Sequence, residues 1–524
     1  MTPVSANASD ETPHRTRRYL TNVLWTWLGV AAGIVSATLL QPYTIRKLGD
    51  VDVGIWMLVL SVVEYYWLID LGFRSATLKM SAEYRALEQP DNLNELLSTG
   101  IAYSSIMAAG IIALAVICSP YAETLWKVDA MDRSVFRDLI LIASTSWALG
   151  MIFNVFGACV EGYQRFDLLG RIWITTTVVR SSGVFLVLYM GKGLLAMGFI
   201  LLGAQLLSYL LTYLSFRRVA PHARITWHLA SFSMLKQMVS YGIHTFTTIV
   251  STRLLNQGLP AIIGYFLPVQ AVAYYYTPMK IMDYATDGIG RVCQVTTPNV
   301  TELMAKNRLP EVAQLGVYAN RYCLSLFLPL VSFLLVYGFE TYSLWVHRPS
   351  FAAASAYLLP VMVIAHAIVA GQANSIAILF GLGKHKTYSR CLLAEALITA
   401  GGMAVVLPRF GLYGAAVLAG TMMVLDRAFV ACFLVCRELE ISFFSYAAKI
   451  YLAPVLIAAG SGLFLLWIKK MWIAGHTWPQ LILAAVIMLI PYSALTFRFC
   501  VAEHHREFFW GRLRSLLARK RSVG

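Results

Sequence analysis

The chain has 524 residues, of which 58% are hydrophobic and only 13% are charged. Soluble domains contain about 25% charged residues, so this composition excludes a soluble globular protein. The net charge of +15 would suggest nucleic-acid binding in a soluble protein, but in a chain this apolar it has another explanation, and no nucleic-acid partner is predicted.

Long apolar segments recur from one end of the chain to the other. A helix needs about 20 mostly apolar residues to cross a bilayer, and about fourteen segments meet this requirement. In chain order they are residues 20–42, 52–71, 98–118, 137–159, 172–190, 194–216, 238–262, 270–292, 320–338, 356–380, 390–407, 411–434, 449–468 and 479–498. The sequence therefore predicts an all-α polytopic membrane protein with about 14 transmembrane helices.

The basic residues predict the orientation of these helices. If the N-terminus is cytoplasmic, the inside segments carry about 27 Lys and Arg residues and the outside loops about 9, which satisfies the positive-inside rule. Both termini are then cytoplasmic, and the basic surplus favours contact with anionic membrane lipids. The first eighteen residues are polar and end in "HRTRR", so we expect an uncleaved cytoplasmic tail.

Two halves of the chain resemble each other. "IVSATLLQ" (34–41) returns as "IVSTRLLN" (249–256), and an offset near 219 aligns "VVEYY" (62–66) with "IMDYA" (281–285). Each copy contains six spans, so both copies have the same orientation, as in transporters built from parallel repeats. The predicted parts are a cytoplasmic tail (1–18), an N-lobe (19–216), a linker (217–237), a C-lobe (238–434), two appended helices (435–500) and a basic cytoplasmic tail (501–524).

Ionisable residues within the spans are candidates for function, because charge is costly in hydrocarbon. The first lobe has Glu64 and Arg180, and the second has Arg253 and the richest stretch, "KIMDYATDGIGR" (280–291). At about 100° per residue its four charged members fall within an arc of roughly 80° on one helix face. They are Lys280, Asp283, Asp287 and Arg291. Such a stripe must face the protein interior or a watery cavity.

Packing explanations stand beside the functional ones. The stripe has i,i+3 and i,i+4 spacing and can neutralise itself as a salt-bridge ladder. Arg180 and Arg253 have no acidic residue within one turn, so they either line a hydrated cavity or pack against carboxylates of other helices, such as Glu64. Asp426 and Arg427 are adjacent, point about 100° apart and are expected to contact different neighbours.

A further group of in-span residues is given structural roles by default. These residues are His244, His366, Cys432 and Cys436.

Arginine in a membrane cavity suits a phosphate ligand. Its planar fork matches phosphate oxygens, and it stays ionised. A lipid-linked diphosphate is an anion that must cross a bilayer, and carboxylates nearby could exchange H⁺ or bind Na⁺ to couple its transport to an ion gradient. No other cofactor and no metal site is predicted.

Residues 47–79, "KLGDVDVGIWMLVLSVVEYYWLIDLGFRSATLK", resemble the second-span signature of bacterial oligosaccharide flippases. These form the polysaccharide-transporter branch of the multidrug/oligosaccharidyl-lipid/polysaccharide (MOP) superfamily and are called Wzx-like. "TTPNVTELMAKN" (296–307), "ILFGLGKHKTYSRCLLAEALI" (378–398) and "FGLYGAAVLAG" (410–420) are similar to second-lobe segments of the family.

The resemblance implies a non-enzymatic transporter of the bacterial inner membrane, with two six-helix lobes working by alternating access. The implied cargo is a polyprenyl-diphosphate-linked oligosaccharide for O-antigen, capsule or exopolysaccharide synthesis, passed on to polymerase or ligase partners. Arg180, Arg253, Lys280 and Arg291 then bind the phosphates. Glu64, Asp283 and Asp287 then couple transport to an ion.

Several alternatives remain open at this point. A drug or cation antiporter of the same superfamily and a peptidoglycan lipid-precursor flippase share the expected fold. "DVD" (50–52) could hold a metal and a sugar nucleotide in a membrane glycosyltransferase, although its loop is predicted to lie outside the cell. A non-transporting assembly scaffold is a further possibility. An ATP-driven pump is not supported, since the chain has no GxxxxGK[ST] motif.

Overall fold

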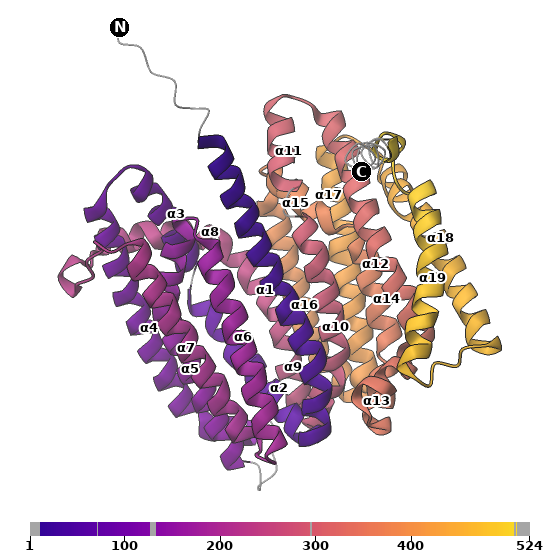
Figure 1. The fold of residues 1–524 in the computed structure, drawn as a ribbon, viewed down its shortest axis with the longest axis horizontal. Helices are drawn as coiled ribbons and strands as arrows, with labels where there is room; N and C mark the ends of the chain where they lie inside the picture. The colour runs from indigo at the N-terminus through magenta and orange to yellow at the C-terminus, as the bar shows by residue number, and fades with distance from the viewer. Residues whose placement is uncertain (1–10, 71, 126–132, 294–295, 508–509, 511–524) are drawn as a thin grey trace, which may run out of the picture. The chain divides into compact units, whose positions relative to one another are not determined.

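The computed structural model describes residues 11–70, 72–125, 133–293, 296–507 and 510 (Figure 1). Within these ranges the chain is helical and contains no β-strand. Nine helical stretches of the described residues are long and apolar enough to cross a membrane. The all-α polytopic membrane fold predicted from the sequence is confirmed.

Contacts divide the chain into two compact units, Met1–Ala273 and Tyr274–Gly524. The helices of the first unit begin and end as follows: α1 Glu11–Leu48, α2 Asp50–Glu64, the 3₁₀ helix η1 Tyr65–Asp70, α3 Phe73–Ala86, α4 Pro90–Leu125, α5 Arg133–Gly162, α6 Phe166–Tyr189, α7 Leu194–Val219, the 3₁₀ turn η2 Trp227–Leu229, α8 Phe232–Arg253, the π-helix η3 Leu254–Gly258 and α9 Leu259–Phe266.

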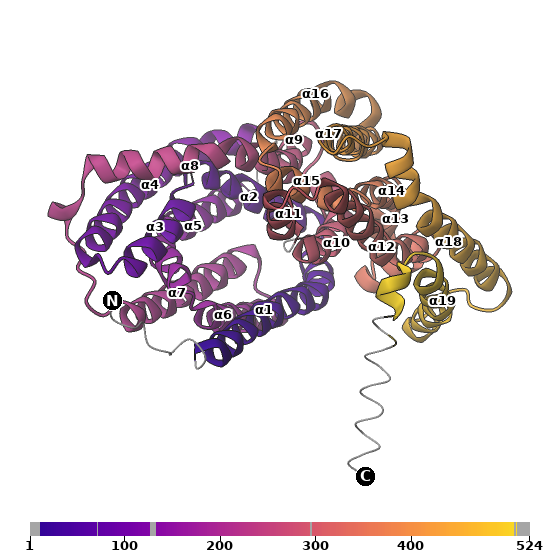
Figure 2. The ribbon, with the colours of Figure 1, turned by 90° about the horizontal axis from the view of Figure 1, so that it is seen from above.

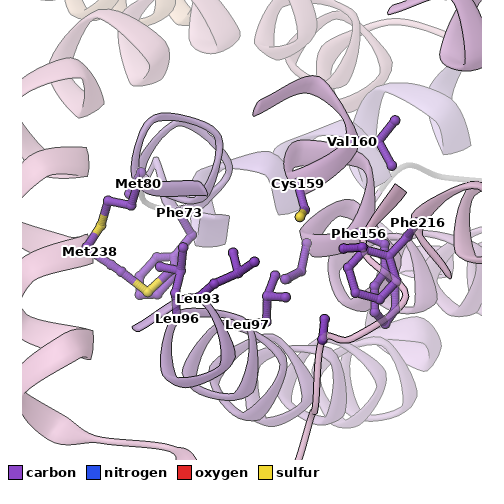
Figure 3. Packing of buried hydrophobic residues seen from close by; sticks show 14 of the residues in the cluster. Phe73, Met80, Leu93, Leu96, Leu97, Phe156, Cys159, Val160, Phe216 and Met238 are labelled. Carbon is purple, nitrogen blue, oxygen red and sulfur yellow. The ribbon is translucent and has the colours of Figure 1, made fainter. Parts of the chain in front are cut away.

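The short helix α3 lies between two predicted spans and packs along one face. Its buried residues Phe73, Ala76, Thr77 and Met80 follow i, i+3, i+4, i+7 spacing, which is the pattern of an amphipathic helix. Figure 3 shows this face within a cluster that includes residues of α4, α5, α7 and α8. The hydrophobic contact fixes one end of the first unit.

The predicted linker, residues 217–237, is attached to α4 by hydrogen bonds. Backbone N–H groups of Arg224, Thr226 and Ser231 donate to side-chain oxygens of α4 at 2.8, 3.2 and 3.0 Å. Ser231 also caps α8, since its hydroxyl accepts from the N–H of Met234. The contact-defined boundary accordingly falls at Ala273, whereas the sequence-based division placed the linker itself between the lobes.

Gly54 permits a close approach of two backbone segments. A Cβ at this position would lie 2.3 Å from the carbonyl oxygen of Val269, in the turn after α9. Backbone cannot move aside as a flexible side chain can, so only glycine fits here. This contact explains the glycine of the "VGIW" sequence in physical terms.

The second unit contains the remaining helices. They are α10 Gln270–Cys293, which begins in the first unit, α11 Thr296–Ala305, α12 Leu309–Val346, α13 Pro349–Ala356, α14 Leu359–Ala370, α15 Ala373–Gly381, α16 His385–Val424, the π-helix η4 Leu425–Val430, α17 Ala431–Glu438, α18 Phe443–Met471 and α19 Trp478–Phe499.

Helices α12 and α18 pack side by side (Figure 2), and their hydrogen bonds show that they run in the same direction. Asn320 bonds Tyr446 and Ser332 bonds the carbonyl oxygen of Ala458, so the same sequence separation of 126 residues recurs along both helices. The chain between two parallel spans must cross the membrane an odd number of times. The long segment Lys386–Glu438 therefore provides two crossings, divided at Gly411, whose φ of 58° breaks the helix.

The packing of the helices supports the internal repeat. The third and fourth spans, α4 and α5, contact each other, and so do the ninth and tenth, α12 and α14. Likewise α5 contacts α7 in the first unit, and α14 contacts η4 in the second. The appended helices α18 and α19 pack on α12 and on each other.

We expect Gly54→Ala to destabilise the first unit. The added methyl group meets Val269 backbone, and such overpacking costs about 1–3 kcal/mol. Gly110→Ala on α4 is the control, because nothing lies within 4 Å of its Cβ position and alanine favours helix. Thermal unfolding of the detergent-purified protein measures both. An equal melting temperature for the two variants would contradict the expected clash.

Candidate functional site

The predicted polar stripe lies on α10, and its first two charged residues, Lys280 and Asp283, form an ion pair. Lys280 Nζ lies 3.6 Å from Asp283 Oδ2 and 4.6 Å from the centroid of the Tyr276 ring. The two charged side chains are 27% and 29% exposed. The self-neutralising pair that the spacing allowed is therefore present, and the ring adds a second favourable contact for the cation.

Arg180 lies on α6 of the first unit, and its side chain is exposed. The side chains of Glu64, Arg253, Asp287 and Arg291 lie outside the described part of the structure. Their assignment as cargo-binding or ion-coupling residues stays a prediction, as it does for Arg180, Lys280 and Asp283.

Two of the predicted residues lie where the helix type changes. Glu64 is the last residue of α2, before the 3₁₀ helix η1, and Arg253 is the last residue of α8, before the π-helix η3. Segments of this kind within longer helices often occur at functional sites, because they leave backbone carbonyl groups without their usual partners.

A buried cluster of charged residues lies between α16 and η4. The Glu395 side chain on α16 is only 3% exposed, and its Oε2 lies 3.9 Å from Arg427 Nε on η4. Asp426 is also buried and interacts electrostatically with Glu395, as does Arg427. Tyr388, one turn into α16, interacts with Asp426 and Arg427. Two carboxylates thus share one guanidinium in an apolar surrounding.

The cluster contains acceptors that are not fully satisfied. Glu395 Oε2 and Asp426 Oδ2 are buried and form no hydrogen bond of standard geometry among the described residues, although the Tyr388 hydroxyl and the two carboxyl groups lie within interaction range of one another. A distance of 3.9 Å to Arg427 is an ion pair rather than a hydrogen bond. Unsatisfied buried carboxylate oxygens call for a proton or a small cation.

His366 on α14 belongs to the surroundings of this cluster. Its Nδ1 is 2.7 Å from the carbonyl oxygen of Met362, one turn earlier, and its ring interacts electrostatically with Arg427. The sequence assigned this histidine a structural role, and the backbone contact is of that kind. Among the described residues, no group of three or more His, Cys, Asp or Glu side chains is arranged to hold a metal ion.

Asp426 and Arg427 share a neighbour, contrary to the expectation from their adjacent positions. Both residues lie in the π-helix η4, whose step per residue is smaller than the 100° assumed for an α-helix. A usable signal was present in the sequence: Glu395 lies 16 residues before Gly411 and Asp426 lies 15 residues after it. In a helical hairpin, residues equally distant from the turn come to the same level.

Comparison with known proteins identifies the family and the fold of this chain. A family model described as polysaccharide biosynthesis protein matches residues 19–304. The chain belongs to the polysaccharide biosynthesis protein family, as the resemblance indicated. No curated protein sequence matches this chain.

Solved structures of the MOP superfamily share the fold at low sequence identity. An inward-facing MATE family multidrug resistance transporter is 13% identical to this chain. The alignment covers 77% of this chain and 94% of the transporter, with a TM-score of 0.68. The lipid II flippase MurJ in an inward closed conformation is 12% identical. The alignment covers 91% of this chain and 99% of MurJ, with a TM-score of 0.70. A mutant of the Vibrio cholerae MATE transporter VcmN is 14% identical. The alignment covers 82% of this chain and 99% of VcmN, with a TM-score of 0.53.

A double-mutant cycle tests the pairing of Glu395 with Arg427. We expect Arg427→Gln to lower stability by about 1–3 kcal/mol, less than for a fully buried pair because Arg427 is 25% exposed. Glu395→Gln removes the buried charge and is expected to be close to neutral. The double variant should recover most of the loss, as measured by denaturant unfolding in detergent. Additive effects, with no recovery, would show that the two side chains do not interact.

Arg437→Gln is the control for this cycle. Arg437 pairs with the neighbouring Glu438 at 3.1 Å, but its side chain is 56% exposed. Exposed pairs contribute about 0–1 kcal/mol, so this variant should unfold like the wild type.

Proposed function

We propose that this protein is a flippase that carries a polyprenyl-diphosphate-linked oligosaccharide across the bacterial inner membrane by alternating access. The observation that carries the proposal is membership in the polysaccharide biosynthesis family over residues 19–304. The fold adds support, because a lipid II flippase aligns with 91% of this chain, whereas a multidrug transporter aligns with 77%.

The chemistry of the cargo follows from the membrane. Sugar units made on one side of a bilayer must be attached to a lipid to stay at the membrane, and the diphosphate of that link is an anion. We propose that Arg180, Arg253, Lys280 and Arg291 bind it, because guanidinium and ammonium groups offset a charge that hydrocarbon excludes. Lys280 is half-buried, with the Asp283 carboxylate and the Tyr276 ring beside it.

We propose that ion coupling involves the Glu395–Asp426 pair on α16 and η4, in addition to the predicted residues Glu64, Asp283 and Asp287. H⁺ or Na⁺ would occupy the unsatisfied carboxylate oxygens and leave when the surrounding helices move. Arg427 limits the cluster to one net negative charge, so one monovalent ion is enough to neutralise it.

We further propose that both termini lie in the cytoplasm. The protein would then pass its cargo to polymerase or ligase machinery that makes O-antigen, capsule or exopolysaccharide. No enzymatic step is part of this proposal. The basic loops would contact the anionic lipids of the cytoplasmic leaflet.

Arg253→Ala is expected to block the transport of lipid-linked oligosaccharide. Removing one charge-assisted contact to phosphate should lower transport roughly tenfold, since such contacts are worth about 1.5–3 kcal/mol. Cells carrying the variant should accumulate polyprenyl-linked oligosaccharide on the cytoplasmic side and lose surface polysaccharide. Lipid extraction and surface staining, at matched protein levels, measure the two effects.

Arg409→Ala is the matched control, because Arg409 is exposed and lies beside the turn at Gly411. Normal surface polysaccharide in Arg253→Ala cells, with a defect in the deletion strain, would show that Arg253 is a packing residue. A normal deletion strain would show that the cargo class is wrong, and drug export would then be measured.

Glu395→Gln tests coupling in reconstituted vesicles. The variant keeps the size of the side chain but cannot release a proton or bind a cation as a carboxylate does. We expect transport to lose its stimulation by an imposed H⁺ or Na⁺ gradient. Glu302→Gln is the control, since Glu302 is 65% exposed on α11 and pairs with Lys306. Full gradient stimulation in Glu395→Gln would place coupling elsewhere, with Asp283 as the next residue to test.

A further inference from the structure

A cavity of about 810 Å³ lies between α12, α18 and the segment that follows α19. Its lining includes Tyr318 and Arg321 of α12, Ser445 and Lys449 of α18, and His504. None of these residues belongs to the Glu395–Asp426 cluster or to the α10 stripe. The cavity is therefore a separate feature of the second unit.

The wall after α19 is held in place by aromatic and polar contacts. The Tyr322 hydroxyl and His505 Nδ1 are 2.7 Å apart, and Tyr322 also accepts a hydrogen bond from the N–H of Ala502 at 3.1 Å. The ring of Tyr318 contacts the rings of His504 and His505. Burial and the neighbouring His504 lower the pKa of His505. The segment after α19, which forms one wall of the cavity, is thus held against α12 by these contacts.

The lining carries positive charge and an unused donor. The Arg321 guanidinium lies over the Tyr318 ring at 5.4 Å, and its Nε is buried without a hydrogen-bond partner among the described residues. Lys449 is exposed at the rim, and Glu503 is the one carboxylate among the lining residues. Two permanent cations thus face one anion. A buried guanidinium N–H without an acceptor, beside a cavity, indicates a ligand with acceptor oxygens.

The position of the cavity along the helices places it near the membrane surface. Helix α12 is kinked at Tyr337, and the span predicted within it, residues 320–338, begins beside Arg321. Arg321 lies 12 residues from the start of α12, or about 18 Å along it. The guanidinium therefore lies close to the boundary between headgroups and hydrocarbon.

An apolar surface continues from the cavity toward the hydrocarbon. Tyr318, Tyr322 and Leu326 are spaced by four residues and form one stripe on α12, and Leu326 is 67% exposed. On the neighbouring α18, Leu452 and Leu456 are 62% and 64% exposed. A ligand that reaches from the cations to this surface needs a phosphate at one end and hydrocarbon chains at the other.

We propose that this cavity binds the phosphate headgroup of an anionic phospholipid, with Arg321 and Lys449 pairing to its oxygens and its acyl chains lying along α12 past Leu326. The bound lipid bridges α12 and α18 and so holds the appended helices α18 and α19 to the rest of the second unit. None of the lining residues is among those proposed to bind the cargo or the coupling ion, so the inference does not depend on which cargo is carried.

Native mass spectrometry of the full-length protein in detergent tests this site, with dioctanoyl phosphatidylglycerol as the probe. We expect one tightly bound lipid per chain and roughly tenfold weaker binding in Arg321→Gln and in Lys449→Gln, because each removes one charge-assisted contact. Lys470→Gln is the matched control, since Lys470 is an exposed lysine at the other end of α18. Its affinity should equal that of the wild type.

Two further ligands separate a lipid from a free phosphate. Glycerophosphoglycerol, the same headgroup without acyl chains, and inorganic phosphate are each expected to bind at least tenfold more weakly. Binding as tight as that of the lipid would assign the site to a soluble phosphate and overturn the proposal. Unchanged lipid binding in Lys449→Gln would also overturn it, and because Lys449 is exposed at the rim this variant does not depend on Arg321→Gln folding correctly.

Discussion

A charge inside an apolar helix must find a partner or water, and this constraint accounts for much of the second unit. Lys280 pairs with Asp283, Arg427 pairs with Glu395, and Lys469 pairs with Glu340 at 2.6 Å. In each pair the partner stabilises a charged side chain that would be costly in hydrocarbon alone. The pairs differ in their charge balance: Lys469 has one carboxylate beside it and also donates to a backbone carbonyl oxygen, whereas two buried carboxylates share Arg427. That difference separates a structural pair from a candidate ion site.

Departures from α-helical geometry lie next to charged positions. Glu64 precedes a 3₁₀ helix, Arg253 precedes a π-helix, and Asp426 lies within one. In hydrocarbon each freed carbonyl group must be satisfied by neighbouring protein, water or a ligand. Helices of this kind are therefore costly in a membrane protein unless they line a site, and their positions agree with the residues proposed for cargo and ion binding.

The sequence motif that resembles the flippase family has a packing role at its glycine. Gly54 lets α2 approach the backbone at Val269, a contact that no larger residue permits. Recognition of the family and identification of the site therefore rest on different residues. The motif containing Gly54 determines how helices pack. The charged residues follow no short motif, and they carry the proposed chemistry.

The sequence by itself predicted the membrane environment, about fourteen spans and the repeat, because an apolar run of about 20 residues has few alternatives to a spanning helix. It also identified Lys280 and Asp283 as a possible pair, since i,i+3 spacing is a local property of one helix. Only the tertiary structure brought Glu395 to Arg427 and joined α12, α18 and the segment after α19 around a cavity. These contacts join residues distant in sequence, and no local pattern in the sequence specifies them.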